Sequence, residues 1–183
     1  MKRRKALILT ASIMGATIIG SELFFIGCTN KGKITKLFSD SDVKLLDEVG
    51  EVILPQTQQS PGAKDAKIGL FMKTIVTDCY NKSEQNIFKN GIMELNRMAQ
   101  NTYSGNFLEL QQEQKYNLLV KLDRETRDIT NEDSPHFFSM MKQLKIWGYF
   151  TSEPGTTKAL RYNPIPGEYI GCIPYKKGDK AWA

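Results

Sequence analysis

The sequence predicts a mainly α-helical protein, with about five amphipathic helices in one compact domain and an extended, Pro/Gly-rich C-terminal tail. Three observations support this fold class. The chain of 183 residues, 40% hydrophobic and 25% charged, has the length and composition of one globular core. Apolar residues recur at helical spacing in five segments. No segment shows the alternation of a strand beyond a few residues. We assign the domain to residues 37–183 and the tail to 148–183.

Residues 1–27 differ from the rest, and we predict that they form an export signal. Four basic side chains at positions 2–5 precede a run of 16 uncharged residues, 6–21. A basic start followed by a short apolar region is typical of a secretory signal. The run is shorter than the ~20 residues that span a bilayer. Because the apolar pattern resumes at 23–26, an uncleaved membrane anchor is the alternative.

Two features of this segment indicate its export route and its cleavage site. Arg3 and Arg4 resemble the pair of a twin-arginine signal, which exports folded proteins. The stretch "FIGC" at 25–28 resembles a bacterial lipobox, in which the cysteine is acylated and becomes the new N-terminus. We therefore expect a lipid on Cys28 and a polar tether over 28–36. The alternatives are general secretory export and a cysteine that merely follows a signal.

The basic character of the chain comes largely from this signal. Without residues 1–27 the chain keeps 21 of its 25 basic and 19 of its 20 acidic side chains, a net charge of +2. Nucleic-acid binding needs basic residues clustered on one face. The remaining chain has no such run, so we exclude this class of function.

Five segments have the pattern of amphipathic helices. The first begins at the cap Ser39 and ends before Pro55, and the second covers 63–80. Ser83 is predicted to cap the third, the fourth covers about 112–128, and the fifth starts at Ser134-Pro135. Their predicted apolar faces include Leu45, Leu46, Val49, Ile68, Met72, Val76, Cys79, Phe88, Ile92, Leu95, Tyr116, Leu119, Leu122, Phe137, Phe138, Met141, Leu144 and Trp147.

The sequence offers little material for catalysis. Its one histidine, His136, stands at a predicted helix start, where we expect a structural role. One imidazole alone makes a poor metal site. The sequence contains no nucleotide-binding glycine loop, no nucleophile elbow and no haem-attachment motif. We therefore expect no catalytic residue, no metal and no cofactor in this chain, which would act by binding something.

The cysteines fit an oxidising compartment outside the inner membrane. If Cys28 carries lipid, Cys79 and Cys172 remain. They could form a disulfide with each other, or one of them could pair with a partner protein. There is no C-x-x-C spacing that would indicate a zinc or thioredoxin-like site.

The order of several segments resembles a known family. The matching stretches are "FSDSDVKLLDEVGEVILP", "PGAKDAKIGLFMKTIVTDCY", "PHFFSMMKQLKIWGYFTSEPGTTKALRYNPIPGEYIGC" and the final "GDKAWA". Together they resemble the gluconate 2-dehydrogenase subunit 3 family, the small subunit of membrane-associated FAD-dependent dehydrogenases. The resemblance runs from 37 to 183, and the segment 148–172 is its most specific part. The lipobox-like Cys28 departs from the family pattern.

The resemblance implies a complex. Its large subunit would be a flavoprotein of the glucose–methanol–choline type that binds FAD and oxidises a sugar or sugar acid, and a c-type cytochrome subunit with haem would often receive the electrons. The small subunit would carry the export signal for a large subunit that folds around FAD before export. It would then reside on the periplasmic side of the bacterial cell envelope, anchored to the membrane by lipid on Cys28.

The C-terminal tail is the predicted contact with the flavoprotein. Aromatic and arginine side chains often anchor interfaces, and proline lowers the entropy lost on docking. The tail could equally wrap its own helices. A free-standing envelope lipoprotein that binds a ligand or acts as a scaffold is the alternative function, and a small enzyme using His136 is a third. The predicted interface residues are Tyr149, Phe150, Glu153, Arg161, Tyr162, Pro166, Tyr169 and Trp182.

Overall fold

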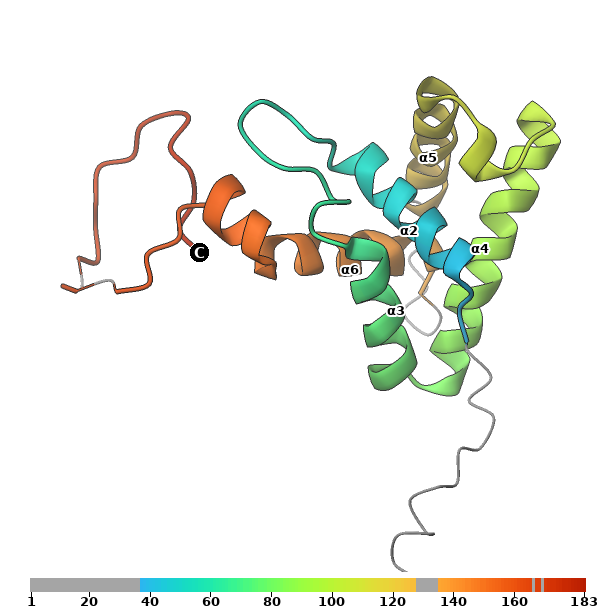
Figure 1. The fold of residues 1–183 in the computed structure, drawn as a ribbon, viewed down its shortest axis with the longest axis horizontal. Helices are drawn as coiled ribbons and strands as arrows, with labels where there is room; N and C mark the ends of the chain where they lie inside the picture. The colour runs from blue at the N-terminus through green and yellow to red at the C-terminus, as the bar shows by residue number, and fades with distance from the viewer. Residues whose placement is uncertain (1–36, 128–134, 166, 169) are drawn as a thin grey trace, which may run out of the picture. The chain divides into compact units, whose positions relative to one another are not determined.

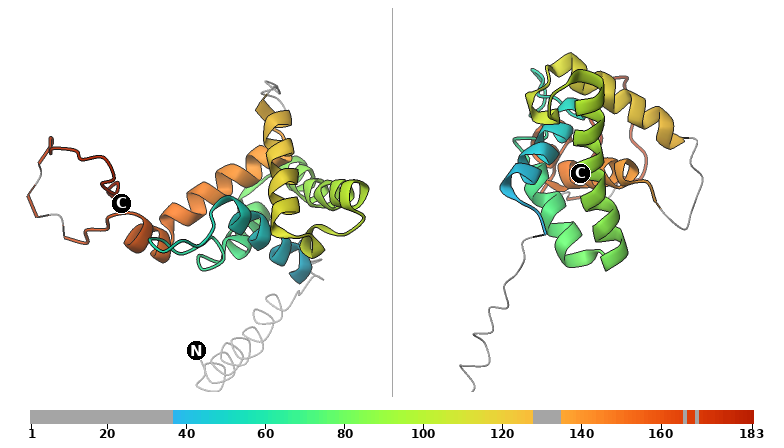
Figure 2. Two further views of the ribbon diagram at one scale, coloured as in Figure 1. Left: turned by 90° about the horizontal axis from the view of Figure 1, so that it is seen from above. Right: turned by 90° about the vertical axis from the view of Figure 1, so that its right-hand side faces the viewer.

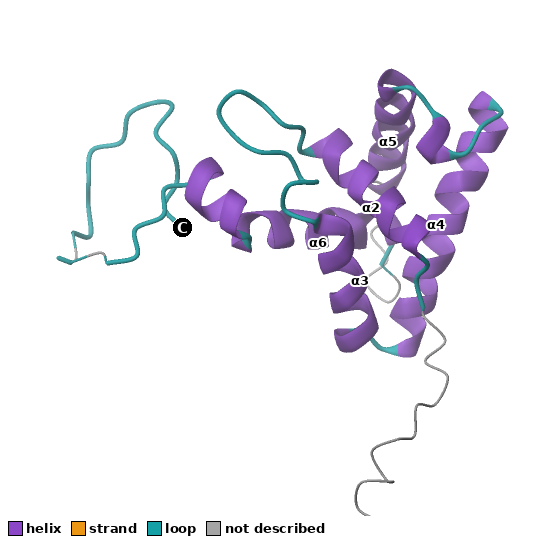
Figure 3. Cartoon of the chain, viewed as in Figure 1, coloured by secondary structure: helices purple, strands orange, loops and turns teal. Residues whose placement is uncertain are grey.

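The computed structural model describes residues 37–127, 135–165, 167–168 and 170–183. Within these ranges the chain is mainly helical, as predicted, and it contains no β-strand beyond one isolated bridge (Figure 3). None of the described helices is long and apolar enough to span a membrane. The described α-helices are α2 (Asp40–Ile53), α3 (Ile68–Cys79), α4 (Lys82–Tyr103), α5 (Gln112–Arg127) and α6 (Phe137–Thr151).

Helix α6 lies at the centre of the helical packing. It packs against α3, α4 and α5, while α2 packs against α3 and α5 (Figure 1). Phe138 and Met141 of α6 are each 1% exposed. They share one core with Leu46 of α2, Met72 of α3 and Leu95 of α4. The α6 sequence therefore has apolar residues around most of its circumference, because it has neighbours on several sides.

One predicted N-cap agrees with the structure, and the predicted starts of α4 and α6 need correction. Helix α6 begins at Phe137 with His136 as its N-cap, two positions after the predicted Pro135. Ser39 caps α2 as predicted, and its hydroxyl accepts from the Asp42 N–H at 3.2 Å. The cap of α4 is Asn81 rather than Ser83, because Asn81 and Glu84 satisfy each other's backbone N–H groups in a capping box. The expectation for Ser83 was wrong by two positions.

Helix α3 starts later than its apolar pattern suggested. Residues 63–67 form turns, and Lys67 adopts a left-handed conformation with φ 51° before Ile68 begins the helix. The Gly69 N–H donates to Asp47 Oδ1 of α2 at 2.7 Å. A carboxylate from another helix thus satisfies one free N–H of the α3 start, a long-range cap that no local sequence pattern indicates.

Three residues of the predicted apolar faces lie at the surface. Tyr116 is 57% and Trp147 54% exposed, and Cys79 is also exposed. Trp147 makes an edge-to-face contact with Phe71 of α3, with ring centroids 5.5 Å apart. Tyr116 and Trp147 lie at the edges of their helical stripes, where periodicity cannot distinguish a buried side chain from one half in solvent. Cys79 follows the stripe of α3 but is the last residue of that helix.

The C-terminal tail is shorter than predicted. Residues 148–151 complete α6, and a single π-helical turn, η3 (Gly155–Ala159), packs against it. The chain becomes extended only from Leu160 onward, where it makes a wide loop and returns toward its own beginning (Figures 1 and 2). We call residues 161–183 the C-terminal arm.

Candidate partner interface

The base of the arm is fastened to the helical core by Tyr149. This side chain is 3% exposed, and its hydroxyl donates a hydrogen bond to the Pro61 carbonyl oxygen at 2.5 Å. Its ring also packs edge-to-face on Phe150, with centroids 5.1 Å apart. Tyr149 therefore holds the loop before α3 against the end of α6, and it has little surface left to offer a partner.

The transition from helix to arm depends on Ser152 and Gly155. The Ser152 hydroxyl donates to the Tyr149 carbonyl oxygen at 2.6 Å and accepts from the Gly155 N–H at 3.2 Å. A Cβ on Gly155 would lie 1.8 Å from the Tyr149 carbonyl oxygen, so only glycine fits this turn. The direction in which the chain leaves α6 is thus set by local packing.

Arg161, the first residue of the arm, is bonded to the last residues of the arm. Its N–H donates to the Ala181 carbonyl oxygen at 2.8 Å, and its carbonyl oxygen accepts from the Ala183 N–H at 3.1 Å. These bonds form an isolated parallel bridge between Arg161 and Trp182. The guanidinium also lies over the Trp182 ring, 4.5 Å from its centroid, in a cation–π contact. We call these four residues, 161 and 181–183, the neck.

Two further contacts order the chain near the neck. The Lys180 ammonium donates to the Lys158 carbonyl oxygen of η3. Asp179 closes a turn in which its N–H donates to the Lys176 carbonyl oxygen at 3.0 Å and its carboxylate accepts from the Lys176 N–H at 2.9 Å. The returning half of the arm is therefore tied both to the π turn and to itself.

Every described residue of the arm is exposed, although many of its side chains are large and apolar. Ile170, Ile173 and Trp182 border a common hollow of about 490 Å³, beside the polar Asn163 and Glu168. Apolar side chains gathered in this way are typical of an interaction surface. The exposed fractions are Tyr162 54%, Ile165 82%, Ile170 63%, Ile173 49%, Tyr175 76% and Trp182 53%.

The predicted interface residues differ in how exposed they are. Arg161, Tyr162 and Trp182 are exposed on the arm, and Arg161 and Trp182 are brought together. Glu153 is exposed near η3, and Phe150 is half-buried. Tyr149 is a core residue, which corrects its assignment to the surface. Pro166 and Tyr169 lie outside the described residues.

The isoleucines of the arm and Tyr175 were missed by sequence reasoning. They follow no helical or strand period, and they are spaced between prolines and glycines. Apolar residues without periodicity in a proline-rich segment are the one signal that could have identified them.

The two remaining cysteines are separate free thiols. Cys79, at the end of α3, and Cys172, in the arm, are both exposed and unbonded in the structure. Pairing with a partner protein stays a prediction. Cys28, Arg3 and Arg4 lie outside the described residues.

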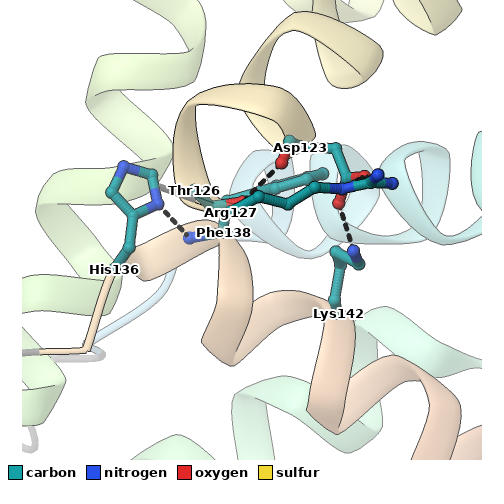
Figure 4. Close-up of polar contacts among 6 residues, drawn as sticks. All are labelled: Asp123, Thr126, Arg127, His136, Phe138 and Lys142. Atoms are coloured by element: carbon teal, nitrogen blue, oxygen red, sulfur yellow. Dashed lines mark hydrogen bonds and ion pairs between the residues drawn. The ribbon is translucent and has the colours of Figure 1, made fainter. Parts of the chain in front are cut away.

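His136 and the polar residues near it form hydrogen bonds that cap α6 and join α5 to α6 (Figure 4). His136 is the N-cap of α6, and its Nδ1 accepts from the Phe138 N–H at 3.2 Å. Partial burial lowers the pKa of His136, against a smaller opposing effect of Glu125. Asp123 of α5 accepts from Lys142 of α6 and, within its own helix, from Arg127 at 2.8 Å. These hydrogen bonds lower the pKa of Asp123 and link α5 to α6.

Lys145 is the buried charge that the sequence did not reveal. It is 1% exposed, and its ammonium has no hydrogen-bond partner among the described residues. Burial lowers the pKa of Lys145 to about 7, with Lys142 adding to the effect and Asp123 opposing it. The sequence did not indicate that Lys145 is buried, because the long lysine side chain usually brings its ammonium to solvent.

No other arrangement in the described part of the chain suggests chemistry. Residues 37–127 and 135–183, without 166 and 169, contain no group of acidic, histidine or cysteine side chains able to hold a metal. A groove of about 200 Å³ between α2, α5 and α6 is mainly apolar, with Val52, Leu119 and Phe138 on its walls. The arm is therefore the candidate functional surface.

The described residues thus combine a helical core with an exposed arm rich in large apolar side chains. The sequence pattern of the gluconate 2-dehydrogenase subunit 3 family matches residues 40–167. The chain belongs to this family, whose description as a subunit implies a multi-subunit complex. The match includes all five described helices and the first seven residues of the arm, and it ends before Trp182. Comparisons with curated proteins and with solved structures give no match.

Proposed function

We propose that this chain is the non-catalytic small subunit of an FAD-dependent sugar or sugar-acid dehydrogenase, and that it docks a flavoprotein of the glucose–methanol–choline type. The observation that carries the proposal is the exposed arm on a chain of a dehydrogenase-subunit family. Besides Trp182, which packs on Arg161, five large apolar side chains of the arm are about half to four-fifths exposed, and burying them on a partner is favourable.

The proposed division of labour places the redox chemistry in the partner. FAD on the large subunit would accept two electrons from a CH–OH group of the sugar, and a c-type cytochrome subunit would pass them on. This chain contributes a rigid helical body, fastened by Tyr149, from which the arm reaches the flavoprotein. Its effect on turnover is to hold the complex together.

Export and membrane association are the second part of the proposal. The basic start with Arg3 and Arg4 is the address, and Cys28 is the site of the lipid anchor. A large subunit that folds around FAD in the cytoplasm needs a route for folded cargo. A signal on a docked partner supplies that route, which places the complex on the periplasmic side of the envelope.

The experiment is affinity purification of the tagged full-length chain from detergent-solubilised membranes. We expect a larger subunit to co-elute, to show flavin absorption bands and to reduce a dye when a sugar or sugar acid is added. Mass spectrometry of the mature chain tests for an acylated N-terminal cysteine. Recovery of a stable, flavin-free monomer would contradict the proposal and favour a free-standing lipoprotein.

A truncation locates the contact. The cut belongs after Leu160, because removing residues from 148 onward would delete the buried Tyr149 and the end of α6. We expect the chain lacking 161–183 to keep its helical circular dichroism and to lose the flavoprotein. Undiminished co-purification by this folded truncation would remove the arm from the interface.

A further inference from the structure

The arm is a closed loop, and Arg161 provides its closure. The backbone of Arg161 is bonded on both sides to the chain end, at 2.8 Å to Ala181 and at 3.1 Å from Ala183. Its guanidinium lies over the face of the Trp182 ring, so a side-chain contact joins the same two segments as these backbone bonds. The described residues between them are all exposed, and besides the Lys180 contact with η3 and the turn at Asp179, the neck is what joins the two ends of the loop.

We propose that the neck, with the contact of Arg161 and Trp182 at its centre, presets the arm as a docking loop, and that the flavoprotein subunit buries Ile165, Ile170 and Ile173 of this loop. This inference rests on the proposed function and adds a mechanism to it. Arg161 is a positioning residue, since it acts by holding the loop closed.

The physical reason is conformational entropy. An open segment of about twenty residues samples many forms, and docking one of them costs free energy for each residue that is ordered. Closing the loop in the free chain removes part of that freedom before the partner arrives. Preorganisation of this kind increases affinity without adding a contact to the partner.

A protein surface fits the arm better than a lipid bilayer does. Among the described residues of the arm, the backbone–backbone hydrogen bonds are those of the neck and the turn at Asp179. Side chains satisfy the N–H groups of Ile165 and Lys176, and the backbone polar groups that have no partner in the arm would be costly to bury in hydrocarbon. A protein can supply hydrogen-bond partners for them. The arm also mixes charges, with Glu168 and Asp179 beside its lysines, which suits a protein surface better than an anionic membrane.

The test measures binding of purified full-length variants to the isolated flavoprotein by titration. Arg161→Ala and Trp182→Ala should each raise Kd by roughly two- to thirtyfold, the range expected for loss of one cation–π contact. The double variant should bind no more weakly than the weaker single variant, because both act through the same closure. Arg124→Ala is the matched control, because it removes an exposed arginine of α5 that lies outside the arm, and it should leave Kd unchanged.

Two readouts separate positioning from direct contact. Hydrogen exchange of the free chain should show protection of the Arg161 and Ala183 amides that is lost in Trp182→Ala. The variant Ile170→Ser/Ile173→Ser should keep this protection and still weaken binding. Additive losses in the double neck variant would overturn the positioning role.

The remaining outcomes are distinct. If the full chain binds the flavoprotein and all neck and isoleucine variants bind equally well, the proposed function stands and this inference fails. If the full chain binds no flavoprotein at all, both fail. If the arm variants lose only retention on anionic phospholipid vesicles, or only a concentration-dependent dimer seen by light scattering, the partner is a membrane or a second copy, and the inference is overturned.

Discussion

The hydroxyl of Tyr149 donates to the carbonyl oxygen of Pro61, 88 positions earlier in the chain. The bond joins the end of α6 to the loop that leads into α3. Since the arm follows Tyr149 by only a dozen residues, this contact sets the place on the helical body from which the arm departs.

Removing only the Tyr149 hydroxyl should weaken the fold modestly. In Tyr149→Phe the ring remains, but the hydrogen bond to Pro61 is lost, which costs about 1 kcal/mol. Denaturant unfolding checks this value. Tyr162→Phe removes the same atom from an exposed arm residue and should change nothing. Equal stabilities of the two variants would contradict the role assigned to Tyr149.

Lys145 should make the stability of the protein depend on pH in the alkaline range. Its folded pKa is about 7, below the 10.5 expected when unfolded, so between these values the unfolded state binds more protons. The free energy of unfolding should therefore rise between pH 7 and pH 9, by about 2 kcal/mol, and this gain should disappear below pH 7.

The variant Lys145→Met isolates this effect. It replaces a buried ammonium by an apolar chain of similar length, so the alkaline gain should be absent and stability at pH 6 should exceed that of the parent. Lys121→Met, which alters an exposed lysine, is the control. Parallel pH profiles for parent and Lys145→Met would show that Lys145 is not desolvated in solution.

Gly91 marks a close approach of α4 and α6. A Cβ at this position would lie 2.3 Å from the Phe137 ring. Gly91→Ala should destabilise the fold by about 1–3 kcal/mol through overpacking, although alanine favours a helix. Gly105→Ala is the control, because its nearest contacts are at 3.7 Å. Thermal unfolding measures both, and a stabilised Gly91→Ala would mean that the helices are farther apart.

His136 should contribute its cap only when it is neutral. A protonated imidazole cannot accept the Phe138 N–H, and burial lowers the folded pKa of His136 below its ordinary value of 6.5. The cap is therefore fully present above the unfolded pKa and is lost as pH falls through the folded pKa.

Substitutions at His136 make this measurable. At pH 8, His136→Ala should lose about 1 kcal/mol of stability, and His136→Asn, which keeps an acceptor, should recover most of it. The difference between parent and His136→Ala should shrink at pH 5. A constant difference across this range would show that the imidazole stabilises α6 by packing alone.

The sequence predicted the helices well and the ends of some poorly. Ser39 caps α2 because its partner Asp42 is local, and the apolar stripes of 3.6 period identified many of the core residues in each of the five described helices, although Leu118 and Met140 were missed. The start of α3 was missed because its cap comes from Asp47, 22 residues away from Gly69. Tyr116 and Trp147 were misplaced because periodicity gives the direction of a side chain and not the cover above it.

The sequence predicted from composition which segment forms the candidate interface, but it did not predict how the residues of that segment are arranged. The proline, glycine and aromatic content of 148–183 indicated a segment without regular structure, and Arg161 and Trp182 were both named for it. Their contact could not be foreseen, because 21 positions separate them and no periodic element connects them. Tyr149 was assigned to the surface because its burial depends on the loop around Pro61.

Local patterns by themselves determined the helical class, the core stripes, the family and the lack of recognisable catalytic motifs, because these properties depend on residues a few positions apart. Tertiary structure alone decided that Lys145 is buried, that Tyr149 is internal and that the arm closes on itself. Those properties depend on which distant segments meet, and that is settled by packing of the whole core.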